Sequence, residues 1–332
     1  MTPADGGVDR DPLRGLVAIV HDLSRTRRAR LMENALLGAT AAQRFSVSRY
    51  PGEGSEGIRM QVERAIEDGA AVVVVGGGDG TFLRILNSLG DRTPTLLVPP
   101  LGTSNDYSRA LGIRTVEEAV NALLAGRTRT VDLGRCSFQD SLGGTEERVF
   151  ASSAGVGLVA SMLQLETLPV IQLVRKIIRD LIYIPLSVAQ ILRTPTARME
   201  LEVNGETLNG SVTLLELAKV GDTGGLRPTP QATPDSGHFD ICIAPGMSRR
   251  KMIGWFADLV RTRHLERPET VYFSESPDLN ELGVGKVRHM RIVTDPPLPV
   301  HLHGEFQGFT PATFTLLPKA MEVFVPCPPP SG

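Results

Sequence analysis

Residues 72–82, Val-Val-Val-Val-Gly-Gly-Gly-Asp-Gly-Thr-Phe, place the tightest limit on how this chain can fold. Consecutive β-branched residues without apolar-polar alternation predict a parallel strand that is buried on both faces. The glycines that follow allow positive φ angles and let backbone N–H groups approach an anion at the carboxyl end of the strand. We therefore predict a phosphate site formed by Gly77, Gly78, Gly80 and Thr81.

One carboxylate, Asp79, lies in the middle of this glycine turn. A carboxylate is a poor direct ligand for a phosphate, but it is a good ligand for a divalent cation and a good acceptor from a hydroxyl group. We therefore expect Asp79 to hold a metal ion or to orient a hydroxyl group beside the phosphate.

A second apolar strand, residues 95–99, runs into another glycine turn at residues 101–112. Gly102 permits the turn, and Thr103 or Ser104 can cap the following helix, whose first N–H groups would face an anion. Carboxyl ends of neighbouring parallel strands meet at one edge of a sheet, so the two turns are expected to converge. A single such turn could be purely structural, whereas the pair favours a ligand site.

Strands alternate with helices in the N-terminal part of the chain. Predicted strands cover residues 16–20, 44–49, 71–75, 95–99 and 129–133, and predicted helices cover residues 28–41 and 55–68. This alternation predicts a doubly wound α/β domain with a parallel sheet. A capping box from Thr115 to Glu118 begins a further helix that Gly126 can end. After about residue 134, short alternating runs and the Asn204-Gly205 turn predict hairpins and a β-rich second domain.

Residues 168–192 form the longest apolar tract, but charged residues and Pro185 interrupt it, which argues against a membrane span. The apolar positions follow helical spacing and predict an amphipathic helix inserted in the second domain. We expect the apolar face of this helix to pack against the core of the second domain. The alternative is that this face contacts a bilayer or an acyl chain.

Composition narrows the class of protein. With 332 residues and 41% hydrophobic content, the chain can form two cores. A net charge of −2 and 5% aromatic residues argue against nucleic acid as a partner. The three cysteines have no metal-ligand spacing and suggest a reducing compartment. Residues 1–12 are expected to be disordered and lack the pattern of a secretory signal, so we expect a cytoplasmic protein; a homodimer is left open.

Taken together, the motif at residues 77–81 and the Pro-Leu-Gly-Thr-Ser-Asn-Asp motif at residues 100–106 resemble the catalytic domain of diacylglycerol kinases and related bacterial lipid kinases. NAD kinases share the first motif, whereas Gly-Thr-x-Asn-Asp followed by x-x-Arg-Ala-Leu-Gly is the lipid-kinase pattern. The resemblance implies a nucleotide-binding domain over residues 13–133 and a β-sandwich-like substrate domain over residues 134–318. It also implies that residues 319–332 return to the first domain and that the active site lies in the cleft between the domains.

The resemblance further implies an ATP-dependent kinase that phosphorylates diacylglycerol or a related lipid alcohol. ATP phosphates would contact the two glycine turns, with Mg²⁺ as cofactor and Asp79 organising the metal. Asn105 and Asp106 would fix the second turn and reach the nucleotide or the water molecules around the metal. Glu305 would deprotonate or orient the lipid hydroxyl, although either Asp79 or Glu305 could be the base. A lipid acceptor implies transient contact with the inner face of the membrane. Related bacterial enzymes carry a structural magnesium where this chain has Asp235, which could instead be a turn residue before Gly237.

Two positions depart from the family pattern. The usual Asp-Gly-Glu is here His303-Gly304-Glu305, and that histidine would lower metal affinity or move the pH optimum, unless it is an ordinary surface residue. In the loop after the first strand, Ser24 alone fits the expected nucleotide-binding residues. These departures keep two alternatives open: a non-catalytic lipid- or nucleotide-binding protein, and a kinase with a soluble acceptor such as NAD.

Overall fold

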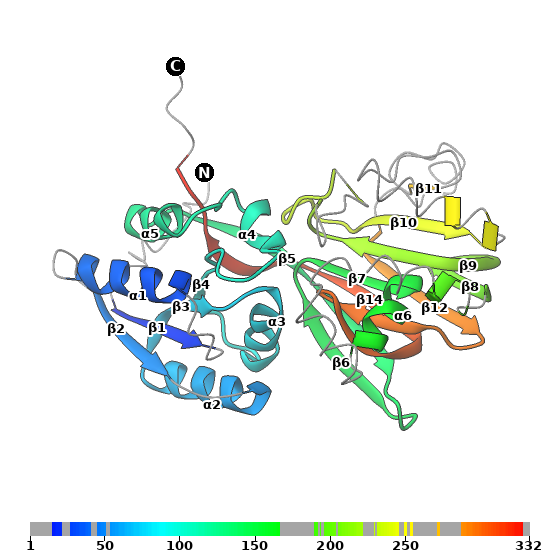
Figure 1. Ribbon diagram of the computed structural model, residues 1–332, viewed down its shortest axis with the longest axis horizontal. Coiled ribbons are helices and arrows are strands. Elements are labelled where there is room, and N and C mark those ends of the chain that lie inside the picture. The colour runs from blue at the N-terminus through cyan, green and yellow to red at the C-terminus, as the bar shows by residue number, and fades with distance from the viewer. Residues whose placement is uncertain are drawn as a thin grey trace, which may run out of the picture. The chain divides into compact units, whose positions relative to one another are not determined.

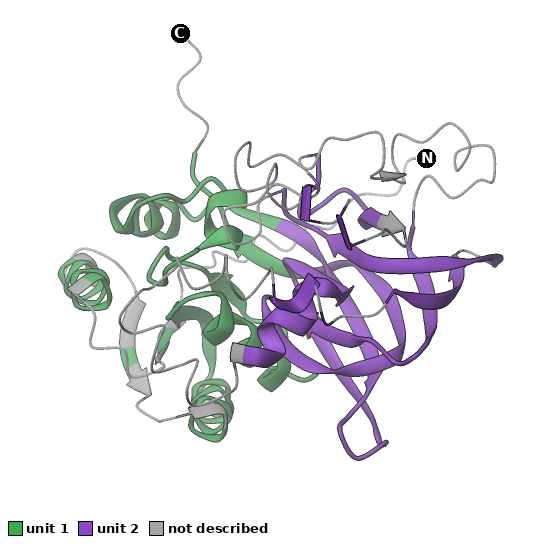
Figure 2. Ribbon diagram, turned by 45° about the vertical axis from the view of Figure 1, so that its right-hand side comes forward, with its two compact units in different colours: residues 1–129, 321–332 green, residues 130–320 purple. Residues whose placement is uncertain are grey.

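The computed structural model describes residues 15–21, 27–40, 45–50, 54–166, 189–191, 193, 196–203, 205–221, 229, 231–245, 249–250, 253–254, 271–272 and 287–327. The chain divides into two compact units (Figure 2). The first comprises residues 1–129 and 321–332, and the second comprises residues 130–320. The chain passes from one unit to the other within the strands β5 (Thr128–Gln139) and β14 (Glu305–Phe324).

The first unit is built on a parallel sheet with the strand order β4-β3-β1-β2. These strands are β1 (Gly15–His21), β2 (Phe45–Tyr50), β3 (Ala70–Gly76) and β4 (Thr95–Leu97). The helices of the unit are α1 (Arg27–Thr40), α2 (Gly54–Glu67), α3 (Asp79–Ser88), α4 (Asp106–Ala110) and α5 (Val116–Ala125). Helix α1 contacts α5, and α2 contacts α3, with the two pairs on opposite faces of the sheet (Figure 1). The doubly wound fold predicted from the sequence is confirmed.

Strand β3 lies at the centre of this unit. The side chains of Val72, Val73, Val74 and Val75 are all 0% exposed, as expected for a strand covered on both faces. Burial of each valine contributes roughly 1.5–3 kcal/mol relative to exposure. The strand that follows is shorter than predicted and ends at Leu97, because Pro99 and Pro100 have no N–H group to continue the ladder.

The C-terminal end of β14 completes the sheet of the first unit. Val323 pairs with Leu96 of β4 in parallel orientation. The carboxylate of Glu322 accepts hydrogen bonds from the hydroxyl groups of Thr95 at 3.1 Å and Thr128 at 2.6 Å. These contacts tie a segment from the end of the chain to the strand that precedes the second glycine turn.

The second unit is mainly antiparallel. Its elements besides β5 and β14 are β6 (Thr145–Phe150), β7 (Ser153–Gly157), α6 (Leu158–Glu166), β8 (Ala197–Val203), β9 (Glu206–Ala218), β10 (Asp240–Pro245), β11 (Val271–Tyr272), β12 (His289–Asp295) and β13 (Pro299–Leu302). The pairings β9-β7-β13-β14-β12-β8-β9 return to their starting strand, so this part of the unit is barrel-like. The hairpin predicted at Asn204-Gly205 is confirmed, since Val203 of β8 pairs with Glu206 of β9.

Several sequence-based expectations have different outcomes. The capping box at Thr115 and Glu118 is present, and Gly126 ends α5 in the left-handed region. Strand β5 continues to Gln139, beyond the predicted end at residue 133. The predicted amphipathic helix at residues 168–192 lies outside the described residues, apart from the helical residues 189–191. Among the helices of the described part of the chain, none has the length and apolar content needed to cross a membrane.

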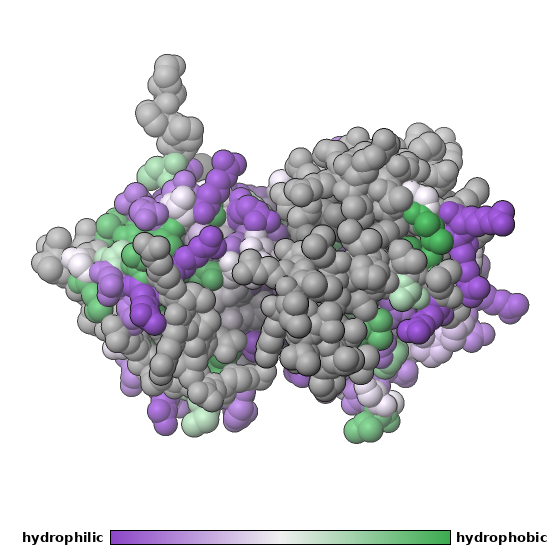
Figure 3. Space-filling model, in the orientation of Figure 1, coloured by the Kyte–Doolittle hydropathy of each residue, from purple (hydrophilic) through white to green (hydrophobic). Residues whose placement is uncertain are grey.

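Large hydrophobic side chains that are exposed are spread over several elements. They are Leu31 and Leu37 on α1, Met60 on α2, Leu142 in the β5–β6 turn, and Ile253. On the face shown in Figure 3, hydrophobic and hydrophilic residues are interspersed over the described surface. The strongest constraints on function therefore come from the polar groups at the strand ends.

Candidate active site

The two glycine turns of the first unit touch through their backbones. A Cβ atom on Gly78 would lie 2.9 Å from the Cα atom of Gly102, and one on Gly102 would lie 2.5 Å from the Cα atom of Gly78. No side chain fits at either position, because real Cβ atoms do not approach backbone this closely. The convergence of the two turns expected from the sequence is confirmed.

The first turn is tightened by its own threonine. A Cβ atom on Gly77 would lie 2.2 Å from the hydroxyl oxygen of Thr81, whose side chain is 5% exposed. Gly78 is the N-cap of α3 and has extended backbone angles, with φ −95° and ψ −163°. The first N–H groups of α3 therefore lie in this turn, where a helix offers partial positive charge to an anion.

Asp79 joins the first turn to the second. It is the first residue of α3 and is half-buried. Its Oδ2 atom accepts a hydrogen bond from the backbone N–H of Asn105 at 2.9 Å, and Oδ1 accepts one from that of Tyr107 at 3.5 Å. A carboxylate at a helix N-terminus also interacts favourably with the helix dipole.

Asn105 closes the second turn. It adopts left-handed backbone angles, φ 54° and ψ 40°, a region that asparagine tolerates better than most residues. Its side-chain oxygen accepts from the N–H of Gly102 at 2.6 Å, and its side-chain nitrogen donates to the carbonyl of Gly102 at 2.9 Å. These bonds hold Gly102 against Gly78. The Asn105 side chain therefore stabilises the conformation of the turn.

Two arginines surround the second turn. Arg109 forms an ion pair with Asp106 and donates to the carbonyl of Ser104. Arg28 of α1 donates to the carbonyl of Gly102 at 3.4 Å and is exposed. Thr103 is exposed as well, whereas the predicted nucleotide contact Ser24 lies outside the described residues. The second turn thus has a cationic side chain from α1 beside it.

In the second unit, Glu305 follows a two-residue hairpin turn between β13 and β14. His303 and Gly304 have φ angles of 51° and 74°, which are typical of a type I′ turn. Glu305 is the first residue of β14, pairs with Leu302, and is half-buried. The pairing of β13 with β14 therefore fixes the backbone position from which the Glu305 side chain extends.

His303 anchors the same turn. Its ring Nε2 atom accepts hydrogen bonds from the backbone N–H groups of Ala151 at 2.7 Å and Ser152 at 3.1 Å, and the residue is 8% exposed. The alternative of an ordinary surface histidine is therefore wrong. Accepting these bonds requires an unprotonated Nε2 atom, and a carboxylate at this position could accept the same N–H groups.

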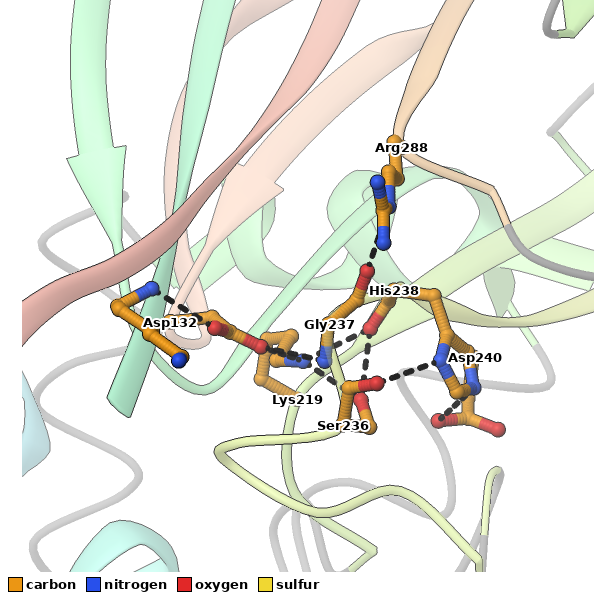
Figure 4. A network of polar contacts seen from close by, with 8 residues as sticks. Asp132, Lys219, Ser236, Gly237, His238, Asp240 and Arg288 are labelled. Carbon is orange, nitrogen blue, oxygen red and sulfur yellow. Dashed lines mark hydrogen bonds and ion pairs between the residues drawn. The ribbon is translucent and has the colours of Figure 1, made fainter. Parts of the chain in front are cut away.

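Sequence reasoning missed a buried ion pair in the second unit. Lys219 is 0% exposed and donates to Asp132 Oδ2 at 2.8 Å, to Ser236 Oγ at 2.7 Å and to the carbonyl of His238 at 2.7 Å (Figure 4). Asp132 also accepts from the backbone N–H of Gly237 at 2.8 Å. Asp132 and Lys219 each interrupt an apolar run in the sequence, and this was the signal that could have identified them as a buried pair.

Burial and pairing act in opposite directions on this pair. Burial alone would raise the pKa of Asp132, but hydrogen bonds from Lys219 and from the backbone N–H groups of Lys319 and Gly237 outweigh it and lower that pKa. Burial lowers the pKa of Lys219, and the hydrogen bond and charge of Asp132 counter part of that effect. These hydrogen bonds favour the ionised form of Asp132, whose charge in turn favours the ammonium form of Lys219.

A second buried pair was also missed. His301 Nε2 lies 2.9 Å from Glu216 Oε1, and both residues are nearly inaccessible. The two side chains meet across Gly155 of β7, where a Cβ atom would lie 2.4 Å from Glu216 Oε1. Gly155 is thus required, because any side chain at this position would enter the space that this pair occupies.

The described side chains around Asp235 offer no cluster of carboxylates for a structural magnesium ion. Asp235 is exposed, and no group of three or more His, Cys, Asp or Glu residues gathers anywhere in the described part of the chain. The oxygen atoms nearby, from Asp132, Ser236 and His238, already surround the Lys219 ammonium group. Asp79 is different, because magnesium bound with a nucleotide needs only one or two carboxylates besides the phosphates.

Comparison with known proteins gives two family matches. The model described as the diacylglycerol kinase catalytic domain matches residues 16–136, and the one described as the YegS C-terminal NAD kinase beta sandwich-like domain matches residues 170–325. The first match includes both glycine turns, and the second includes Glu305.

Curated relatives and a solved structure agree with these matches. The diacylglycerol kinase of Staphylococcus carnosus (strain TM300) is 23% identical over 286 residues, which are 85% of this chain and 85% of the relative. That of Bacillus subtilis (strain 168) is 24% identical over 260 residues, covering 77% and 78%. A crystal structure of a diacylglycerol kinase from Bacillus anthracis str. Sterne shares the fold, with a TM-score of 0.64 at 17% identity and coverage of 94% and 97%. The chain therefore carries a diacylglycerol kinase catalytic domain at residues 16–136, followed by a YegS-type C-terminal domain at residues 170–325.

Proposed function

We propose that this protein is an ATP-dependent lipid kinase that transfers the γ-phosphoryl group of ATP to the hydroxyl group of diacylglycerol or a related lipid alcohol. The observation that carries the proposal is the backbone contact between Gly78 and Gly102, with Asp79 bonded across it. Two glycine turns joined in this way offer backbone N–H groups and a carboxylate at one point, which suits a phosphate with its metal ion.

The first role of the turns is to bind phosphate oxygens. We assign this role to the backbone groups of Gly77, Gly78 and Gly80, to the hydroxyl groups of Thr81 and Thr103, and to Gly102. Dipoles held in fixed positions stabilise charge that develops on the transferred group without reorganising during the reaction. The exposed guanidinium group of Arg28, bonded to the Gly102 carbonyl, would add positive charge beside the same oxygens.

We assign the two carboxylates different roles. Asp79 would orient the γ-phosphoryl group through the metal, and Glu305 would accept the proton of the attacking lipid hydroxyl or orient that hydroxyl. Magnesium, bound with ATP, would supply positive charge that offsets the charge of the phosphates. Asn105 and Asp106 are proposed as positioning residues, because their side chains bond to Gly102 and Arg109 within the turn.

A kinase with a lipid acceptor must reach the membrane in which that lipid resides. Diacylglycerol and similar alcohols reside in membranes, so we propose a cytoplasmic enzyme in transient contact with the inner membrane face. Relatives named diacylglycerol kinase support this class of acceptor. Identity of 23–24% leaves the particular lipid to experiment.

The test is incubation of the purified full-length protein with γ-labelled ATP, magnesium and a lipid panel in mixed micelles. Diacylglycerol, a sphingoid base, ceramide and phosphatidylglycerol are offered separately, beside NAD without detergent. The Asp79→Asn variant is the matched control, since it keeps the shape of the side chain and removes its charge. We expect labelled lipid from the wild type and at least a ~100-fold lower rate from the variant, as for loss of a group that stabilises transition-state charge.

The other outcomes discriminate between the alternatives. Labelled NAD without labelled lipid would overturn the proposal in favour of a kinase with a soluble acceptor. ATP binding without any labelled product would overturn it in favour of a non-catalytic binding protein. A turnover in Asp79→Asn close to the wild-type value would remove Asp79 from the mechanism.

A further inference from the structure

We propose that the ammonium group of Lys219 is a built-in structural cation, which takes the place of the structural magnesium ion implied for this region of the second unit by the family resemblance. The observation is the set of oxygen atoms around Lys219 Nζ: Asp132 Oδ2, Ser236 Oγ and the carbonyl oxygen of His238, all at 2.7–2.8 Å (Figure 4). The inference does not depend on the proposed function.

The hydrogen-bond pattern favours the charged form of Lys219 and opposes the lowering of its pKa by burial. The hydroxyl group of Ser236 donates its own hydrogen to the carbonyl of His238 at 2.9 Å, so its oxygen accepts from Lys219. The Asp132 carboxylate and the His238 carbonyl can only accept. Three acceptors require three N–H donors, which an ammonium group has and a neutral amine lacks.

The segments that meet at this ammonium group are far apart in the sequence. Asp132 lies on β5, Lys219 directly follows β9, and residues 236–238 form the turn before β10. Lys219 also donates its backbone N–H to the carbonyl of Ser152 at 2.7 Å, and Arg288 donates to the carbonyl of Gly237 at 2.9 Å. One cation therefore ties three segments together, which is what a structural metal ion does in small domains.

The charge at this site also suits a monovalent cation. The Asp132 carboxylate, 2% exposed, is matched by one ammonium charge. The other two ligands, Ser236 and the His238 carbonyl, are neutral. Asp240 and Asp235 act on Lys219 only through space, since neither is among its three hydrogen-bond acceptors, and burial raises the pKa of Asp240. A divalent ion at the same point would lack the second carboxylate that hard cations favour.

A consequence follows for magnesium dependence. If Lys219 is the structural cation, the fold of the second unit needs no divalent metal, and any magnesium requirement belongs to the nucleotide. The direct test uses the full-length protein without nucleotide or lipid. The midpoint of thermal unfolding, Tm, is compared in excess EDTA and in millimolar magnesium chloride, for the wild type and for Asp79→Asn, which removes the carboxylate assigned to the nucleotide-bound metal.

We expect the Tm of Asp79→Asn to be the same in EDTA and in magnesium. A magnesium-dependent rise in the Tm of that variant would overturn the proposal, because it would show a metal that stabilises the fold away from Asp79. Since no substrate is present, the result is independent of whether the protein is a lipid kinase.

A double variant tests whether the same oxygens form a cation site. Lys219→Ala with Ser236→Asp removes the internal ammonium group and adds a second carboxylate beside Asp132. We expect its Tm to fall in EDTA and to rise by several degrees in magnesium or calcium chloride. Lys319→Met is the matched lysine control, because Lys319 is exposed and bonds to Asp132 through its backbone N–H. The Tm of this control should be the same with and without magnesium or calcium.

A double variant that folds with a Tm indifferent to metals would contradict the assignment of these oxygens as a cation site. If the double variant does not fold in EDTA, refolding with added magnesium becomes the readout, and recovery of folded protein is the expected result. Failure in both media leaves the Asp79→Asn measurement as the deciding one, with the outcomes given above.

Discussion

Asp79 of the first unit and Asp132 of the second are held alike by backbone N–H groups but differ in what lies beside them. Each accepts two such groups from segments distant in the sequence. Asp132 is 2% exposed and also accepts from the ammonium group of Lys219. Asp79 is half-buried, and its hydrogen-bond partners in the described part of the chain are backbone groups alone.

This difference shows how an aspartate can have either a structural or a chemical role. A carboxylate that is neutralised by an internal cation holds segments together and has no charge left for a ligand. A carboxylate that is fixed only by backbone groups has no cationic side chain paired with it, so it can interact with a metal ion or a hydroxyl group. We therefore propose a structural role for Asp132 and a chemical role for Asp79.

The largest expected effect is on stability, from Lys219→Met. The variant keeps the length of the side chain but leaves the Asp132 carboxylate buried without its cation. Loss of one partner from a buried ion pair costs about 3–5 kcal/mol, which should appear in urea unfolding. The exposed Lys319→Met change should cost less than ~0.5 kcal/mol. Equal stability of these two variants would remove the structural role assigned to Asp132 and Lys219.

The next largest effect is expected from Gly102→Ala, which changes the turn that is bonded to Asp79. The added Cβ atom would lie 2.5 Å from the Cα atom of Gly78, so the two turns must separate. Displacement of a binding group by about 1 Å can cost ~10²-fold in rate, and we expect a loss of that order in turnover. Gly38→Ala is the control, because a Cβ atom there meets nothing within 4 Å. Wild-type turnover in Gly102→Ala would show that the contact between the turns is not needed.

His303→Ala should have a smaller effect, on stability first. It removes the acceptor of two buried backbone N–H groups, at a cost of roughly 1–3 kcal/mol. His303→Asp supplies a carboxylate acceptor and restores the family's Asp-Gly-Glu, so it should recover stability relative to alanine. Thermal unfolding of the three proteins makes the comparison. If alanine and aspartate are equally destabilising, the acceptor role of the ring is not what stabilises this turn.

The smallest expected effect is a pH dependence. The pKa of Asp132 is lowered in the folded protein, so its contribution to stability is present above the ordinary aspartate pKa of about 4 and is lost as pH falls through the lowered value. Asp240, whose pKa burial raises, acts in the opposite direction, so the wild type must be compared with Asp132→Asn. The variant should lose less stability than the wild type between neutral and acidic pH. Parallel curves would contradict the lowered pKa.

Prediction from sequence succeeded where the signal was local. The valine run of β3, the capping box of α5 and the β8–β9 hairpin each depend on neighbouring residues, and each is present. The convergence of the glycine turns also followed, because the parallel order of strands brings their carboxyl ends to one edge.

Prediction failed where partners are distant. Lys219 and Asp132 are 87 positions apart, and His303 is 152 positions from Ala151. Nothing local marks such pairs except a polar residue in an apolar run, because register and barrel closure decide which residues meet. The family pattern directed attention to Asp235, which stays a prediction as a metal ligand, whereas the buried Lys219 ammonium group was found only in the structure.

The central claim is that Asp79 acts in the chemistry and Asp132 in the fold. The most direct measurement compares turnover of labelled ATP into lipid with Tm for Asp79→Asn and Asp132→Asn, at a temperature where both variants are folded. We predict that Asp79→Asn loses little Tm but at least ~100-fold in turnover, while Asp132→Asn loses clearly more Tm and turns over within a fewfold of the wild type. The reverse pattern, with turnover lost in Asp132→Asn and kept in Asp79→Asn, would contradict the account.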